Sequence, residues 1–243
     1  MNVARSLRWR VLITVLACAL LPAVSFAQDP LPDPASSTAE NTDQGHQRIF
    51  GIIPNYRTSP TLKDYHPLTP KEKFKVAAQD SFDRGTFVLA ALFAADAQWT
   101  NSTPSFGSGV RASARYYPAA LSDLVVGDLM TEAVYPVALR QDPRYFRRGT
   151  GSGWTRLGYA IGQIFWTHAD SGGTQFNFSE IVGNATAVGI ANAYYPDNRT
   201  VSSNMSKLSQ QIGVDVIANI LKEFSPDLDR VFSRRHPHES NRP

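Results

Sequence analysis

Helix start and stop signals divide the chain beyond residue 68 into six segments, and this pattern is the feature that most limits its fold. The clearest start is Thr69-Pro70-Lys71-Glu72. It supplies a hydroxyl for an unpaired amide, a proline at the first helical position and a glutamate three residues after the cap. This capping box predicts a helix from Pro70. Asp83 predicts the N-cap of a second helix, over Arg84–Trp99.

The third and fourth helices are predicted on either side of a glycine-rich junction at residues 149–153. We expect Pro118 to open the third helix, which runs towards Arg140. We also expect a kink at Pro136, because proline removes an internal hydrogen bond. The fourth helix is predicted over Trp154–His168.

Two more helices complete the predicted fold. Ser179 or a neighbour is expected to cap the fifth helix, which reaches Tyr195, and the sixth begins near Ser202 and ends before Pro226. No strand pattern of comparable length occurs, so we predict an all-α fold, a single bundle of about six helices. The sixth helix carries one apolar stripe, formed by Leu208, Ile212, Val216, Ile220 and Phe224.

The first 27 residues have the pattern of a cleavable export signal. Residues 1–10 hold three arginines and no acid, Val11–Val24 is an apolar run, and Ser25-Phe26-Ala27 is a small-x-small cleavage signal. The run is shorter than the roughly twenty residues that span a bilayer. We therefore expect cleavage following Ala27 and localisation in the periplasm or at the surface of a cell-envelope membrane.

Loss of this leader changes the charge and the cysteine content. Removing its three arginines from the 24 Lys and Arg leaves 21, equal to the 21 Asp and Glu. A neutral exported chain is not expected to bind nucleic acid. The only cysteine, Cys18, lies in the leader, so the mature chain has no disulfide, thiolate metal site or cysteine nucleophile.

The composition also predicts the domain boundaries. Residues 28–47 are acidic and rich in Pro, Ser and Thr, which predicts a disordered linker. The apolar run Arg48–Pro54 is too short for a helix and is expected to lie extended at the edge of the domain. We expect the helical domain to occupy residues 48–232 and a disordered tail to follow over 233–243.

Three carboxylates and one histidine are the candidate catalytic residues. Asp96 interrupts an apolar helix face, and Glu132 and Glu180 lie on predicted helices, so the three could form an acid cluster. Solvated faces or arginine salt bridges would explain the same acids. His168 could act as a base, although a helix-capping role explains it equally. No Glu-x-x-His pair occurs, and we expect no metal and no cofactor.

The strongest local charge lies at residues 140–156, beside three glycines. Guanidinium groups next to bare backbone amides can hold phosphate or a lipid headgroup. The alternative is a solvated loop that pairs with the acidic linker. The candidate anion- and lipid-binding residues are Arg140, Arg144, Arg147, Arg148 and Arg156.

Small residues on more than one face of the fifth helix, including Gly183, Ala187 and Gly189, would let other helices approach its backbone closely. Such faces drive helix association in lipid, and in a soluble bundle they permit tight crossings. Aromatic residues near the predicted helix ends are typical of a membrane interface and equally of bundle packing. Examples are Tyr116, Tyr117, Tyr135, Trp154, Trp166, Tyr194 and Tyr195.

Several runs resemble a family of uncharacterised exported bacterial envelope proteins. They are Phe50–Arg57, Leu68–Phe74, Asp142–Arg147 and Phe176–Asn184, together with Tyr194-Tyr-Pro196. The resemblance covers most of residues 49–225 and implies a location in a bacterial envelope. It implies no catalytic or binding residue.

These observations favour a non-enzymatic, membrane-associated helical bundle that binds lipid headgroups or an envelope protein. The alternative is a periplasmic hydrolase or metal-binding protein that uses a buried carboxylate cluster. A third possibility, a bundle that binds a small molecule, is not separated from the first by sequence. Neither the ligand nor the oligomeric state follows from the sequence.

Overall fold

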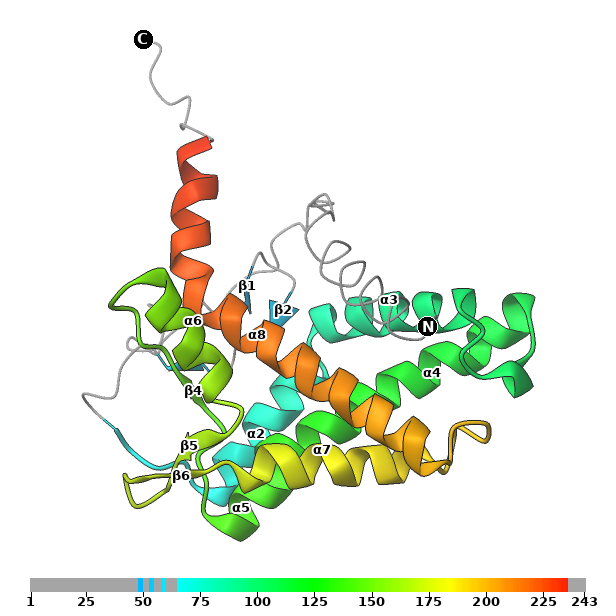
Figure 1. Ribbon diagram of the computed structural model, residues 1–243, viewed down its shortest axis with the longest axis horizontal. Coiled ribbons are helices and arrows are strands. Elements are labelled where there is room, and N and C mark those ends of the chain that lie inside the picture. The colour runs from blue at the N-terminus through cyan, green and yellow to red at the C-terminus, as the bar shows by residue number, and fades with distance from the viewer. Residues whose placement is uncertain (1–47, 50–52, 55–57, 60–64, 236–243) are drawn as a thin grey trace, which may run out of the picture. The chain divides into compact units, whose positions relative to one another are not determined.

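The computed structural model describes residues 48–49, 53–54, 58–59 and 65–235. The expected signal peptide, the linker at 28–47 and the last eight residues of the tail lie outside this range. Within it the predicted all-α class is confirmed (Figure 1). The helices are α2 (Pro70–Ser81), α3 (Arg84–Trp99), α4 (Gly109–Asp128), α5 (Tyr135–Leu139), α6 (Gly153–Gly162), α7 (Phe178–Ala191) and α8 (Val201–Arg235), with the short η2 (Pro104–Phe106) and the π-helix η3 (Leu129–Val134).

The first two helices start where the capping signals predict. The Thr69 amide donates to Glu72 Oε2 at 2.8 Å, and the Glu72 amide donates to the Thr69 hydroxyl at 3.3 Å, which completes the capping box of α2. At α3 the Gly85 amide donates to Asp83 Oδ1 at 2.8 Å. Both caps are local features, so the sequence alone specifies them.

The third helix begins earlier than predicted. α4 starts at Gly109, and Pro118 lies inside it. Proline removes one internal hydrogen bond, but Ala112 and Tyr116 are buried in the preceding turns, and this packing holds them helical. The helix then continues through η3, whose wider turns directly precede α5 and Pro136.

The predicted fourth helix is half helix and half hairpin. α6 ends at Gly162, and β5 (Trp166–His168) pairs antiparallel with β6 (Thr174–Phe176). Thr167 is buried between an exposed Trp166 and a half-buried His168, which is the alternation of a strand. Gly172 has φ +91°, a conformation that favours glycine, and lets the chain turn back. The expected position of His168 at a helix end is therefore wrong.

The bounds of the last two helices also differ from the prediction. Asn177 caps α7, because its Oδ1 accepts from the Glu180 amide at 3.2 Å, while Ser179 donates its hydroxyl to Gln141. α8 does not end before Pro226 but continues to Arg235. The Lys222 carbonyl, which the proline leaves without its helical partner, accepts from the Ser225 hydroxyl at 3.1 Å.

The remaining strands are short pairs. β1 (Arg48–Ile49) and β2 (Ile53–Pro54) pair antiparallel, so these four residues are extended as expected. β1 contacts α8, and β2 contacts α3. β3 (Thr58–Ser59) pairs in parallel with β4 (Tyr145–Phe146). No helix of the described residues is long and apolar enough to cross a membrane.

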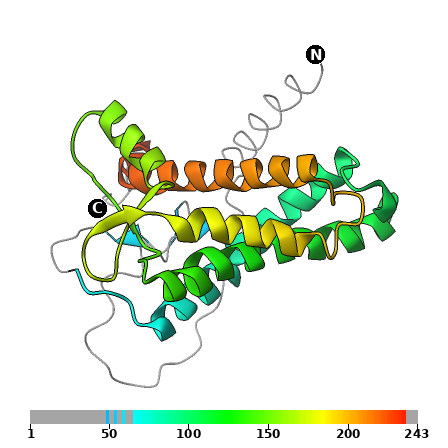
Figure 2. The same cartoon turned by 60° about the horizontal axis from the view of Figure 1, so that its bottom comes forward.

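Helix α7 lies between α8 on one side and the α4–η3 helix on the other (Figure 2). Small side chains occupy much of the packed interior of the bundle, among them the fully buried Ala90, Ala112 and Ala133. A Cβ on Gly183 would stand 2.9 Å from Thr131 Cγ2, so only glycine allows this approach of α7 to η3. Of the small residues predicted to allow close approach, Gly183 and Ala187 are buried inside the bundle, whereas Ala185 and Gly189 are exposed.

Candidate functional site

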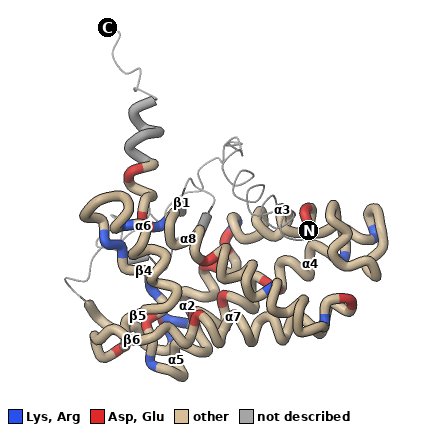
Figure 3. Tube along the Cα trace, in the orientation of Figure 1, with Lys and Arg blue, Asp and Glu red and all other residues tan. Residues whose placement is uncertain are grey.

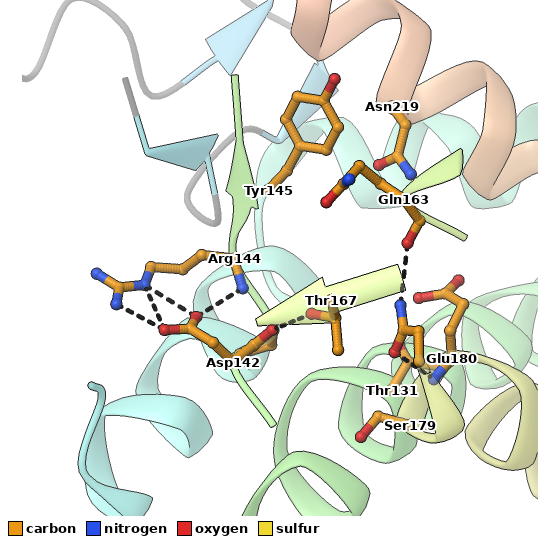
Figure 4. A pocket seen from close by; sticks show the side chains of 11 residues that line it. Thr131, Asp142, Arg144, Tyr145, Gln163, Thr167, Ser179, Glu180 and Asn219 are labelled. Carbon is orange, nitrogen blue, oxygen red and sulfur yellow. Dashed lines mark hydrogen bonds and ion pairs between the residues drawn. The ribbon is translucent and has the colours of Figure 1, made fainter. Parts of the chain in front are cut away.

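A polar cavity of about 30 Å³ opens where β4 and the hairpin meet α7 and α8. The cavity has room for about two water molecules, because one water molecule needs roughly 10–15 Å³ of cavity volume. Figure 4 shows its walls, to which Thr131, Asp142, Arg144, Tyr145, Gln163, Thr167, Ser179, Glu180 and Asn219 contribute.

Glu180 is the one candidate acid that lines this cavity. It is buried, and its Oε1 accepts from Asn184 Nδ2 at 3.2 Å. Asn184 also donates to Asp215 Oδ2 of α8 at 3.0 Å, so one carboxamide joins two carboxylates on different helices. This polar bridge lies between α7 and α8.

Arg144, one of the five candidate anion-binding arginines, is paired inside the protein. Its Nη2 lies 2.7 Å and its Nε 3.0 Å from the oxygens of Asp142, a bidentate contact whose carboxylate is completely buried. The guanidinium also donates to the His66 carbonyl at 2.6 Å and lies 5.1 Å from the Phe146 ring centre. In Figure 4 it points away from Glu180.

A second arginine, Arg156, belongs to a cradle that already contains an anion. The completely buried carboxylate of Glu223 accepts from the amides of Arg148 and Gly149 at 3.0 and 2.9 Å and from Arg156 Nε at 2.8 Å. The Tyr145 hydroxyl also donates to it at 2.9 Å. The arginine and glycine amides thus hold an anion, as the sequence suggested, but the anion is a side chain of α8.

The other three arginines lie at the surface. Arg140 ends α5 with φ 53° and is exposed, Arg148 is exposed, and Arg147 is half-buried. Among the described residues, none of these three guanidinium groups has an ion pair. Arg148 lies 5.9 Å from the ring centre of Tyr159.

The structure does not bring the four candidate catalytic residues together. Asp96 is exposed on α3, whereas Glu132 is buried in η3. His168 packs edge-on against Phe146 at 4.7 Å, and no hydrogen bond reaches its buried Nδ1 within the described part of the chain. Burial lowers the pKa of His168 although Asp142 opposes this. No group of three or more metal-ligating side chains occurs among the described residues.

The structure contains a buried ion pair that no sequence pattern predicts. Lys73 of α2 is almost completely buried and donates to both oxygens of Asp170, at 2.8 and 2.7 Å, and to the Pro136 carbonyl at 3.1 Å. No local pattern marks Lys73, because its partners follow 63 and 97 residues later.

A second buried cluster joins α4, the end of α7 and α8. The hydroxyls of Tyr194 and Tyr195 donate to Asp123 at 2.6 and 2.8 Å, and Lys207 Nζ lies 3.4 Å from the Tyr195 ring centre. Burial raises the pKa of Asp123, although both tyrosines favour its charged form, and burial lowers the pKa of Lys207. Tyr194 and Tyr195, two of the aromatic residues near the predicted helix ends, therefore form hydrogen bonds inside the protein.

Helix α2 buries three polar side chains, Lys73, Asp80 and Ser81. Phe74 within the helix and Phe82 at its C-cap are 45% and 65% exposed, beside the exposed polar side chains of Lys71, Glu72, Lys75 and Gln79. On the surface of a water-soluble bundle, phenylalanine is expected to face the core.

Helix α7 has a reversed arrangement, with polar side chains buried and apolar residues exposed. Its buried face includes Ser179, Glu180 and Asn184. Every exposed residue of this helix is apolar, and the set consists of Phe178, Val182, Ala185, Gly189 and Ile190.

Helix α6 and the strand after it also expose large apolar side chains. Trp154 is 83% exposed, and Ile161, Phe165 and Trp166 are each exposed by more than a third. Large apolar side chains thus point outward from three helices, while ion pairs and carboxamides fill part of the interior.

The chain matches no protein-family model, no curated protein and no solved structure. The resemblance to exported envelope proteins therefore stays a prediction, and the function has to be argued from the geometry.

Proposed function

We propose that this chain is a non-enzymatic protein of the bacterial envelope that associates with a membrane through outward apolar faces of its helices. The reversed arrangement of α7 and the exposed phenylalanines within and at the end of α2 support the proposal most directly. Contiguous apolar surface on a soluble monomer is limited to a few hundred Å² and, where larger, marks an interaction site. Lipid acyl chains would cover such faces without requiring a partner of matching shape.

The small-residue interior supports the same proposal. Helices that associate within lipid pack through Gly, Ala, Ser and Thr, because acyl chains compete with large apolar side chains for contacts. Here Ala77, Ala90, Ala94 and Ala187 are buried, while Phe74 and Phe82 of the same part of the fold are not.

Cell fractionation tests the proposal. The full chain is expressed with its own leader, and the membranes are washed first with high salt and then with carbonate. We expect the protein in the membrane fraction after the salt wash, because apolar contacts are not screened by ions. Recovery of the whole protein in the soluble periplasm would refute the proposal.

A pair of variants links the result to the apolar faces. Phe74→Ser with Phe82→Ser should shift the protein towards the soluble fraction, since each exposed phenylalanine loses about 1–2 kcal/mol of transfer free energy. Lys71→Ser with Gln79→Ser changes two exposed polar positions of the same helix and serves as the matched control. Equal release of both variants would show that the apolar side chains are not responsible.

The alternative of a hydrolase or metal-binding protein gains no specific support. Of its candidate residues, only Glu180 lines the cavity, and Asp96 is exposed. The cavity has room for water molecules and not for an ester or a phosphate ester.

A further inference from the structure

The exposed side chains of α6 continue onto the hairpin and form one surface. Trp154 and Ile161 are seven residues apart in α6, so they lie on one face of the helix along roughly 10 Å, and the exposed Phe165 follows in the turn that leads from α6 to β5. Trp166 contacts Phe176 at 6.1 Å between ring centres, and Phe176 contacts Phe178 at 4.9 Å. We call these six residues the α6 patch.

Arg148 lies beside the start of this patch. Its Nε would stand 3.9 Å from a Cβ on Gly151, and the same Cβ would stand 3.8 Å from Thr155, which follows Trp154 in the first turn of α6. Arg147 precedes it in the loop. Figure 3 shows the basic positions gathered in the chain that leads into α6.

The Glu223 cradle fixes the backbone of the loop that carries these two arginines. Glu223 is bound through the backbone amides of Arg148 and Gly149 and through the side chain of Arg156. The guanidinium groups of Arg147 and Arg148 take no part in that contact. The loop is thus anchored to α8, while the exposed Arg148 and the half-buried Arg147 have no ion pair among the described residues.

We propose that the α6 patch with Arg147 and Arg148 is the surface that docks on an anionic bilayer, its tryptophans at the interface and its arginines on lipid phosphates. This inference rests on the proposed function and names the face and the lipid charge. Tryptophan favours the level of the headgroups, and arginine binds phosphate oxygens in a bidentate manner.

A bilayer fits this surface better than a protein partner does. The patch mixes aromatic side chains on a helix with others on a hairpin, and its cations lie at one end. This matches the layering of a membrane interface, where apolar chains lie beneath charged headgroups.

Vesicle flotation tests the inference with the exported protein, purified from cells that express the full chain. We compare phosphatidylcholine vesicles with vesicles that also contain phosphatidylglycerol. The wild type should bind the anionic vesicles more tightly, and Arg148→Glu should weaken that binding by about fivefold or more, the effect of about 1 kcal/mol per interfacial cation. Arg111→Glu, an equal charge change at an exposed position of α4, is the control.

The aromatic part is tested with Trp154→Ser against Trp99→Ser, which removes an equally exposed tryptophan from α3. In Figures 1 and 2 the turn that follows α3 lies at the opposite side of the described helices from α6. Weaker binding to both kinds of vesicle for Trp154→Ser alone supports the inference. Unchanged thermal melting curves confirm that the variants are folded.

The outcomes separate the two proposals. Failure of the wild type to float with any vesicle would refute membrane association itself. Equal binding of the wild type to neutral and anionic vesicles, with no effect of Arg148→Glu, would refute the α6 patch alone. If Arg148→Glu leaves vesicle binding intact but abolishes cross-linking to an envelope protein in cells, the patch docks a protein and the lipid inference is wrong.

Discussion

Replacing Glu223 by Gln should destabilise the fold more than any other single charge-neutralising change at α6 or α8. The Glu223 carboxylate is completely buried and accepts four hydrogen bonds, from Tyr145, Arg148, Gly149 and Arg156. A carboxamide of the same size keeps one acceptor oxygen and turns an NH₂ group towards donors. Arg156, with a side chain 12% exposed, would lose its most buried counterion.

The expected loss follows from the geometry. Breaking a buried ion pair by changing one partner costs about 3–5 kcal/mol, and the retained oxygen places Glu223→Gln near about 3 kcal/mol. With a urea m-value of about 2–3 kcal/mol/M, the unfolding midpoint should fall by about 1 M. Asp227→Asn is the control, because this second partner of Arg156 is 45% exposed and exposed pairs contribute about 0–1 kcal/mol.

The pH dependence provides a second check. Burial alone would raise the pKa of Glu223, but the hydrogen bonds from Arg156 and from the Gly149 and Arg148 amides outweigh it and hold the pKa below its ordinary value. A lowered pKa stabilises the fold above the unfolded-state value of about 4.3, and this gain is lost as the pH falls through the folded-state value. The difference in unfolding free energy between wild type and Glu223→Gln should therefore be full near pH 7 and shrink below about pH 4. An equal difference at both pH values, or a midpoint shift no larger than that of Asp227→Asn, would refute the reasoning.

Three further changes test the packing of α7 and the buried ion pair of α2. Gly183→Ala should lower the unfolding free energy by about 1–3 kcal/mol, because its Cβ would stand 2.9 Å from Thr131 Cγ2. Gly189 lies in the same helix, and a Cβ there would have no atom within 4 Å, so Gly189→Ala should raise the unfolding free energy by up to about 1 kcal/mol. Shifts of the same sign for the two variants in thermal melts would contradict this reasoning. Asp170→Asn should cost about 3–5 kcal/mol in urea titrations, since it leaves the buried Lys73 ammonium without its carboxylate. A loss under about 1 kcal/mol would show that water reaches Lys73.

Local signals predicted the helices that local interactions specify. The Thr69 capping box and the Asp83 cap need only residues within three positions, so the starts of α2 and α3 agree with the structure. Proline was a weaker guide. The sequence predicts helix boundaries at Pro118 and Pro226. Both prolines instead lie inside helices that tertiary packing stabilises.

The candidate site was predicted in its chemistry and not in its partners. The glycines and arginines of residues 140–156 predict binding of a phosphate or a lipid headgroup, whereas in the structure Arg156 and the amides of Arg148 and Gly149 hold a carboxylate of the protein itself. This carboxylate, of Glu223, lies 67 residues beyond Arg156, and no spacing in the sequence connects them. For the same reason the pair Lys73–Asp170 and the cluster around Asp123 were missed.

The sequence by itself determined the helical class, the caps of α2 and α3, and the lack of cysteine chemistry beyond residue 18, because these depend on composition and on contacts within one or two helical turns. Only the tertiary structure decided which helix faces point outward. Helical periodicity places Phe74 and Lys73 on neighbouring faces of α2, but it does not say which face meets the bundle. That choice depends on Asp170 and Pro136, which the fold brings to Lys73 from distant parts of the chain, and it leaves the phenylalanines at the surface.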